Sequence, residues 1–215
     1  MAGAVLVAAA LVIIWTARAS IGKTVYVSGL GAAGESTAEW FELALLLLVG
    51  GGFCVAWAVR SLRGSARWLV MWSPSVSLVV SSSLFFVASQ VPCTTGCPLP
   101  VGDAFTWQDL VHTIAAILAF GAAALAMLQV SFVPGRVLLR RVSLTAGVAT
   151  ALISAAGGIL SLLQLGTDVG SMLELLATTV GMGWLTILGI FVAVEERSAL
   201  GERTGYKRRG GAVAA

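Results

Sequence analysis

Seven polar side chains lie where long apolar stretches of this chain begin or end. Ionisable groups inside a bilayer are costly, and they usually face a cavity, a partner or a polar pathway. Carboxylate, amide and imidazole groups can exchange protons, hold a cation or hydrogen-bond a polar ligand. All seven lie toward one membrane face in the topology derived below, so we predict a single outward-facing polar pocket. Its candidate residues are Glu39, Glu42, Gln90, Asp109, His112, Gln164 and Glu174.

Two pairs in this set have helical spacing. Glu39 and Glu42 are three positions apart, as are Asp109 and His112. Residues with this spacing share a helix face, so each pair can point at one cavity. The alternative is that these are interfacial groups whose side chains reach headgroups and water, with the acids placed favourably at helix N-termini. As a general acid or base His112 has a carboxylate neighbour, but no nucleophile is identifiable beside it.

A second candidate is the segment from Pro92 to Pro100, which holds Cys93 and Cys97 around Gly96. Topology places this loop in the oxidising space outside the cytoplasmic membrane, where disulfides persist. We therefore predict a structural Cys93–Cys97 disulfide. A redox role is disfavoured because the spacing is CxxxC and no cationic neighbour or helix N-terminus activates a thiolate.

Metal and cofactor sites are the remaining chemistry to consider. Cys93, Cys97 and His112 with Asp103 or Asp109 could bind a metal ion, but a disulfide would remove two thiolate ligands. His112 is the one histidine in the sequence, which excludes bis-histidine haem ligation. We predict no metal and no cofactor.

Six apolar stretches position these groups. The chain is 58% hydrophobic and 11% charged, against about half and about a quarter in soluble domains. A bilayer-spanning helix needs about 20 apolar residues. The sequence predicts an all-α polytopic membrane protein, with residues 1–194 forming a single bundle of six transmembrane helices. The expected spans are 3–19, 39–59, 69–89, 110–132, 142–165 and 171–194. The first is expected to be a retained helix, since no basic region precedes its apolar run as in a signal peptide.

The basic residues orient this bundle. Eleven of the thirteen fall on one side, which by the positive-inside rule is the cytoplasm. Both termini are then cytoplasmic in a multi-pass protein of the cytoplasmic (inner) membrane, and the Cys93–Cys97 loop is extracytoplasmic. Residues 195–215 form a basic tail that we expect to be disordered, and the formal net charge of +3 reflects topology rather than a nucleic-acid partner. The eleven are Arg60, Arg63, Arg67, Arg136, Arg140, Arg141, Arg197, Arg203, Lys207, Arg208 and Arg209.

Small residues predict how the helices pack. Ser73, Ser77 and Ser81 repeat every four residues and form a stripe that can hydrogen-bond across a helix contact. Pro74 is expected to kink the same helix. The run Gly50–Gly52 predicts a close helix approach in the second span.

Three short motifs carry a resemblance to a known family. They are the run Val27-Ser28-Gly29-Leu30-Gly31-Ala32, the Pro-Cys outer loop, and Asp109-Leu110-Val111-His112 leading into Thr113-Ile114-Ala115-Ala116. Because these motifs follow one another in this order, the chain resembles a bacterial membrane family, domain-of-unknown-function family 998, over about residues 3–194. The resemblance implies a six-helix bundle without an assigned activity, distantly similar to eukaryotic six-span proteins associated with lipid and autophagy biology. It transfers no catalytic residue.

The sequence shows no nucleotide loop, paired histidines or hydrolase motif. We therefore expect a non-enzymatic protein that binds a lipid or a partner protein through its bundle and its outward-facing pocket. Its partners would be membrane lipids, another membrane protein or a second copy of the chain. One alternative is a proton-coupled small-molecule transporter, and another is an intramembrane enzyme acting on lipid or quinone with Glu42, Asp109 and His112 as acid–base groups.

Overall fold

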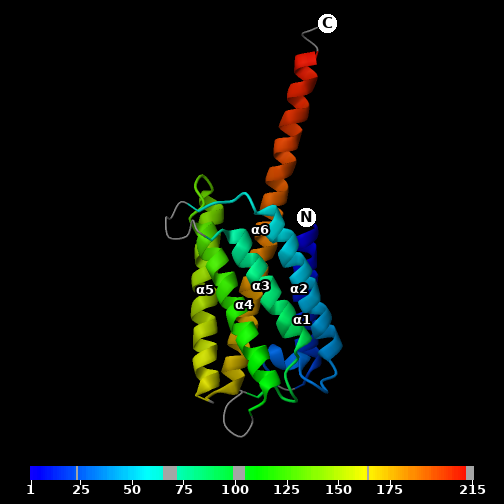
Figure 1. Ribbon diagram of the computed structural model, residues 1–215, viewed down its shortest axis with the longest axis vertical. Coiled ribbons are helices and arrows are strands. Elements are labelled where there is room, and N and C mark those ends of the chain that lie inside the picture. Colours follow the sequence, from blue (N-terminus) through cyan, green and yellow to red (C-terminus); the bar gives the residue numbers. More distant parts are fainter. Residues whose placement is uncertain (23, 65–71, 99–104, 164, 212–215) are drawn as a thin grey trace.

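The structure is a computed structural model that describes residues 1–22, 24–64, 72–98, 105–163 and 165–211 (Figure 1), with Thr167 and residues 199–211 described by their backbone alone. Every regular element in these ranges is helical, which confirms the all-α prediction. The elements are α1 (Ala2–Ser20), the 3₁₀ helix η1 (Ser28–Gly31), α2 (Ala38–Ala58), α3 (Pro74–Gln90), α4 (Trp107–Ser131), α5 (Val137–Leu162) and α6 (Thr167–Gly211).

Five of the described helices are long and apolar enough to cross a membrane, namely α1, α2, α4, α5 and α6 over residues 168–198. The 17 residues of α3 extend only about 25 Å at 1.5 Å per residue. Large apolar side chains cover the outside of the bundle, with Trp57 70% exposed and Val12, Ile117 and Leu152 exposed as well. An apolar surface this extensive requires lipid around it. The chain is therefore a multi-pass membrane protein.

The helices pack in the order of the sequence. Each consecutive pair is in contact, and a contact between α1 and α6 closes the ring, with α2 also touching α6. Figure 1 shows both chain ends at the same end of the bundle, beside the α2–α3 and α4–α5 connections. We call this the termini end. The opposite end, which carries residues 21–22, 24–37 and 91–98, is the loop end.

Glycines allow α2 to approach both neighbours closely. A Cβ atom on Gly51 would lie 2.8 Å from the carbonyl oxygen of Gly3 and 2.6 Å from Val7 in α1. A Cβ atom on Gly52 would overlap the Ser82 hydroxyl in α3. A larger residue at Gly51 would meet backbone and push α1 and α2 apart, whereas one at Gly52 would require the Ser82 hydroxyl to move. The predicted close approach within Gly50–Gly52 is confirmed at these two positions.

The predicted kink at Pro74 is wrong. Pro74 is the first residue of α3, where proline is favoured because no intrahelical N–H is needed. Ser73 is the N-cap, and its hydroxyl accepts a hydrogen bond from the Val76 N–H at 3.4 Å. This helix therefore begins later than the expected residue 69, and residues 65–71 lie outside the described ranges.

The two members of the predicted serine stripe that lie inside α3, Ser77 and Ser81, hold this helix to α4. Ser77 donates a hydrogen bond to the side-chain oxygen of Gln129 at 2.8 Å, and Ser81 donates to the Ala119 carbonyl at 2.9 Å. All four residues are buried. In hydrocarbon an unpaired hydroxyl would cost free energy, so these pairs fix the α3–α4 contact.

The last helix continues past the bundle. Its backbone is helical from Thr167 to Gly211 and projects from the termini end (Figure 1), where the sequence predicted a disordered tail from residue 195. At the start of this extension, Glu195 forms a 2.7 Å ion pair with Arg136 of the α4–α5 connection. The ion pair joins the start of the extension to the bundle.

Candidate functional site

The segment between α1 and α2 folds into the loop end of the bundle and is held there by α6. Val27 and Leu30 of this segment are buried in the core. The Glu174 carboxylate in α6 accepts hydrogen bonds from the backbone N–H groups of Val27, at 2.7 Å, and Ser28, at 3.3 Å. These N–H groups open η1 and have no partner within it, so an acid satisfies them favourably. Glu174 is thus an anchor for the first loop.

Asp109 anchors the second loop in the same way. Its carboxylate accepts hydrogen bonds from the Thr94 backbone N–H at 2.7 Å and from the Thr94 hydroxyl at 2.8 Å. The hydroxyl of Thr106, the N-cap of α4, also donates to it. Asp109 is fully buried, and these three donors leave it little capacity to bind anything else.

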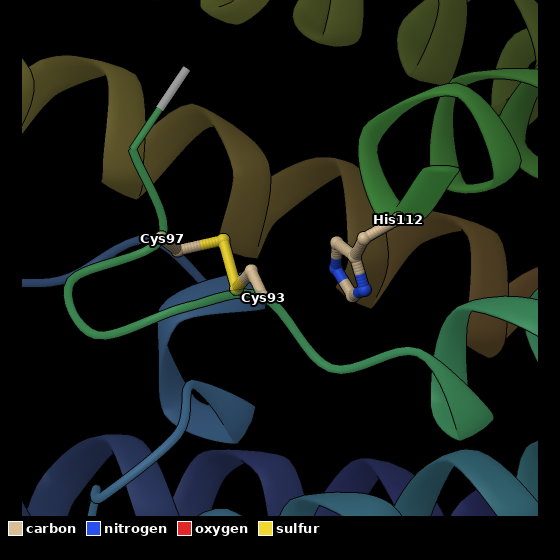
Figure 2. Close-up of side chains that lie close together, drawn as sticks. All are labelled: Cys93, Cys97 and His112. Carbon is tan, nitrogen blue, oxygen red and sulfur yellow. A yellow bond between two sulfur atoms is a disulfide. The ribbon is translucent and has the colours of Figure 1, made fainter. Parts of the chain in front are cut away.

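The two loops are joined to each other. The Ala33 N–H donates to the Cys93 carbonyl at 3.0 Å, and the Thr95 hydroxyl donates to the Ala33 carbonyl at 3.0 Å. The predicted Cys93–Cys97 disulfide is present (Figure 2), closed by a turn in which Gly96 has φ +82°. We call residues 24–37 and 91–98 together the cover, because they close the loop end of the bundle.

His112 belongs to α4 and lies beneath the cover, beside the C-terminal end of α3. Its Nδ1 atom is 3.1 Å from the Ala88 carbonyl oxygen and 2.8 Å from that of Val91. A carbonyl oxygen only accepts hydrogen bonds, so Nδ1 carries the proton and, in the neutral ring, Nε2 keeps its lone pair. The side chain is buried, and Figure 2 shows the ring beside the disulfide.

Two cavities meet at His112. The first, the core cavity, has a volume of about 80 Å³ and is lined by residues from all six α-helices and from η1. Most of its wall is apolar, including Leu48, Phe85, Phe120 and Met127. Glu174 and Thr150 supply polar atoms to this wall. Since the cavity lies inside the helix ring, a ligand there would be surrounded by the bundle.

The second, the loop-end cavity, has a volume of about 270 Å³. It lies between the first loop, the start of α2 and the end of α3, and Glu39, Glu42 and Gln90 line it. Four residues belong to the walls of both cavities: Phe41, Leu45, Ala88 and His112. The two cavities are therefore neighbours, with charged side chains in the lining of the loop-end cavity and a mostly apolar lining around the core cavity.

The structure thus divides the seven predicted pocket residues. Glu39, Glu42, Gln90 and His112 line one cavity, and Glu174 lines the other together with His112. Asp109 is not among the described residues that line either cavity. Its carboxylate instead accepts hydrogen bonds from Thr94 of the second loop. Gln164 lies outside the described residues.

Thr150 is one of the polar lining residues that the sequence analysis did not select as candidates. Thr150 in the middle of α5 is 1% exposed, and its hydroxyl has no hydrogen-bond partner among the described residues. A buried hydroxyl without a partner costs about 1–3 kcal/mol. A lone threonine in an apolar span carries no pattern that distinguishes it from a packing residue, so the sequence held no signal for it.

Fold and site together define a multi-pass membrane protein whose internal cavity is closed at one end by two joined loops. The family model described as "Protein of unknown function (DUF998)" matches residues 1–190, so the chain belongs to this family and the predicted resemblance is confirmed. No curated protein and no solved structure matches the chain. The motifs that carried the resemblance, residues 27–32, the Pro-Cys loop and residues 109–112, meet at the cover.

Proposed function

We propose that this protein binds a small amphipathic molecule, a lipid or lipid-like compound, between its helices. The observation that carries this proposal is the adjacency of the two cavities, which share His112 and three apolar residues. Ligand sites are characteristically apolar clefts with a few polar groups that fix orientation. An amphipathic ligand would place its apolar part in the core cavity and its polar head in the loop-end cavity.

Thr150 supports a ligand in the core cavity. Thr150 lines that cavity, and its buried hydroxyl has no hydrogen-bond partner among the described residues. By contrast, the Thr186 hydroxyl donates to the Met182 carbonyl of its own helix at 2.9 Å. A ligand oxygen or nitrogen in the cavity would satisfy the Thr150 hydroxyl. The proposed ligand therefore carries a hydrogen-bonding atom along its apolar part, as an ester, ether or hydroxyl group would provide.

The size of the core cavity restricts the apolar part. An apolar cavity of about 150 Å³ can bind benzene, and the core cavity measures about 80 Å³. It accommodates a slim chain segment rather than a ring system. This favours an acyl or alkyl chain over the quinone considered from the sequence.

The charged residues in the loop-end cavity restrict the charge of the ligand's polar head. Glu39 and Glu42 are the charged side chains among the described residues that line it. A phosphate there would be repelled by both carboxylates, whereas an amine or a neutral hydroxylated head would not. We therefore propose a cationic or neutral head.

We further propose that α3 also crosses the membrane, giving six spans with both termini in the cytoplasm and the cover outside. Described arginines at the termini end support this orientation by the positive-inside rule: Arg60, Arg63, Arg136, Arg140, Arg141 and Arg197. Single cysteines in a Cys54→Ser background test it with a membrane-impermeant maleimide on intact cells. Ser36→Cys in the cover should react, and Pro134→Cys in the α4–α5 connection should not. The opposite pattern would overturn the orientation.

The head preference can be tested with two amphiphiles of equal chain length, an alkylamine and an alkyl phosphate. The alkylamine should raise the unfolding temperature of the purified protein, and Glu42→Gln should reduce that shift. Glu196→Gln, an exposed acid near the end of the bundle part of α6, is the matched control and should leave the shift unchanged. Equal stabilisation by both amphiphiles, or stabilisation by the phosphate alone, would contradict the proposed head class.

A further inference from the structure

We propose that Cys93, Cys97 and His112 bind one thiophilic metal ion, such as Zn²⁺ or Cu⁺, when the two cysteines are reduced. Their two Sγ atoms and one His112 ring nitrogen all lie within 4.8 Å of one another (Figure 2). Zinc binds thiolate sulfur at about 2.3 Å and imidazole nitrogen at about 2.0–2.1 Å, which places tetrahedral ligand atoms roughly 3.5–3.8 Å apart. Small movements of the released sulfur atoms would satisfy these distances.

The hydrogen bonds of His112 suit a metal ligand. Nδ1 donates to the carbonyl oxygens of Ala88 and Val91, which leaves the Nε2 lone pair for the ion. Metal-binding histidines usually donate their other N–H to a carbonyl or carboxylate, which fixes the tautomer and the ring orientation. Two thiolates and one imidazole form a ligand set that soft and borderline cations prefer.

Contacts other than the disulfide hold the loop in place. Asp109 accepts two hydrogen bonds from Thr94, next to Cys93. The Cys93 carbonyl is held by Ala33, and the Cys97 N–H donates to the Thr94 carbonyl at 2.8 Å. None of these bonds involves a sulfur atom, so we expect both thiols to stay beside His112 when the disulfide is opened. Cys93 is 1% exposed and Cys97 only partly covered, so an ion would enter from the Cys97 side.

Metal binding releases protons but transfers no electrons. A metal ion displaces the two thiol protons, forms two metal–sulfur bonds and one metal–nitrogen bond, and leaves a fourth position for water. The thiols exist before the disulfide forms, or after a dithiol reductant opens it by exchange, when the reductant becomes a disulfide and the cysteines gain two electrons and two protons. The disulfide removes the two thiolate ligands in the oxidised chain alone.

The test uses the full chain in detergent, reduced with a phosphine that is then removed without oxygen. Zn²⁺ is titrated against a chromophoric chelator, and Co²⁺ reports thiolate ligation through its charge-transfer absorption. We expect one ion per reduced chain and none per oxidised chain. Cys93→Ser and Cys97→Ser should each abolish binding. Cys54→Ser is the matched control, because Cys54 is an exposed free cysteine in α2, and it should bind normally.

His112 is tested separately from folding. His112→Gln should weaken Zn²⁺ binding at least about tenfold, since loss of even an outer-shell partner costs about 10–100-fold, and the Co²⁺ charge-transfer band from the two thiolates should remain. A variant that fails to fold is recognised by loss of that band together with helical circular dichroism. Zn²⁺ binding that is absent in the reduced wild type, unchanged in His112→Gln, or retained in Cys93→Ser would overturn the proposal.

Discussion

Asp109 in α4 accepts hydrogen bonds from both the backbone N–H and the hydroxyl of Thr94, at 2.7 and 2.8 Å. This pairing joins a membrane helix to the disulfide loop 15 positions earlier in the chain. An acid that the sequence placed in a ligand pocket is therefore an anchor for the cover. Asp109 was also a candidate acid–base residue, but its carboxylate already accepts hydrogen bonds from Thr94 and Thr106.

Asp109→Asn should lower the free energy of unfolding by about 1.5–3 kcal/mol, the cost of losing hydrogen bonds to a charged group. The amide has one accepting oxygen in place of two, so it cannot receive all three donors. Denaturant unfolding in detergent, followed by circular dichroism, measures the change. Asp168→Asn is the control, because Asp168 is exposed, and its effect should lie within about 0.5 kcal/mol. Equal effects of the two variants would reject the anchoring role.

Glu174→Gln should loosen the first loop. The N–H groups of Val27 and Ser28 bond different oxygens of the carboxylate. Because the amide keeps only one of these oxygens and is uncharged, one hydrogen bond is lost in this geometry and the other is weakened. Hydrogen exchange followed by mass spectrometry should show faster exchange in a peptide covering residues 25–32. The same peptide should be unchanged in Glu196→Gln. Unaltered protection in Glu174→Gln would mean that Glu174 does not hold the loop.

Opening the disulfide should destabilise the protein moderately. A loop of about five residues predicts a loss of roughly 2 kcal/mol by the chain-entropy relation, and Cys97→Ser measures this in chemical unfolding. Maleimide labelling of the unfolded, unreduced wild type should modify Cys54 alone. Labelling of three cysteines in fresh, unreduced protein would reject the disulfide.

Thr150→Val should have opposite effects on stability and on binding. In the empty protein it removes an unpartnered hydroxyl, so the free energy of unfolding should rise by about 1 kcal/mol. In the liganded protein it removes a hydrogen bond, so ligand retention should fall. Thr186→Val is the control, because its hydroxyl already bonds Met182, and it should show neither the gain in stability nor the loss of ligand.

Helix bounds were largely predictable because apolar length alone sets them in a membrane. The expected spans for α1, α2, α4 and α6 agree with the observed helices in their described parts to within a few residues at the bundle ends, whereas α5 begins earlier and α3 later than expected. At the start of α3, a proline inside an apolar run was read as a kink. Ser73 and Pro74 are instead a cap and a first residue, a pattern that marks a helix start.

The division of the polar residues could not be predicted. Whether an acid faces a cavity or a loop N–H depends on how a distant loop folds back, as in the pairing of Glu174 with residue 27. Helical spacing reports which side chains share a face, but not what lies opposite that face. The proximity of His112 to Cys93 arises from the same cause, since the end of α3 and the start of α4 meet beneath the cover.

The most direct test of the central claim is native mass spectrometry of the protein extracted from its own membrane, comparing two phenylalanine substitutions in α4. Ala123 lines the core cavity, whereas Leu118 is exposed on the outside of the bundle. Wild type and Leu118→Phe should retain one amphipathic molecule with a cationic or neutral head, and Ala123→Phe should lose it. Retention of the same molecule by Ala123→Phe, or bare protein in all three samples, would contradict a ligand between the helices.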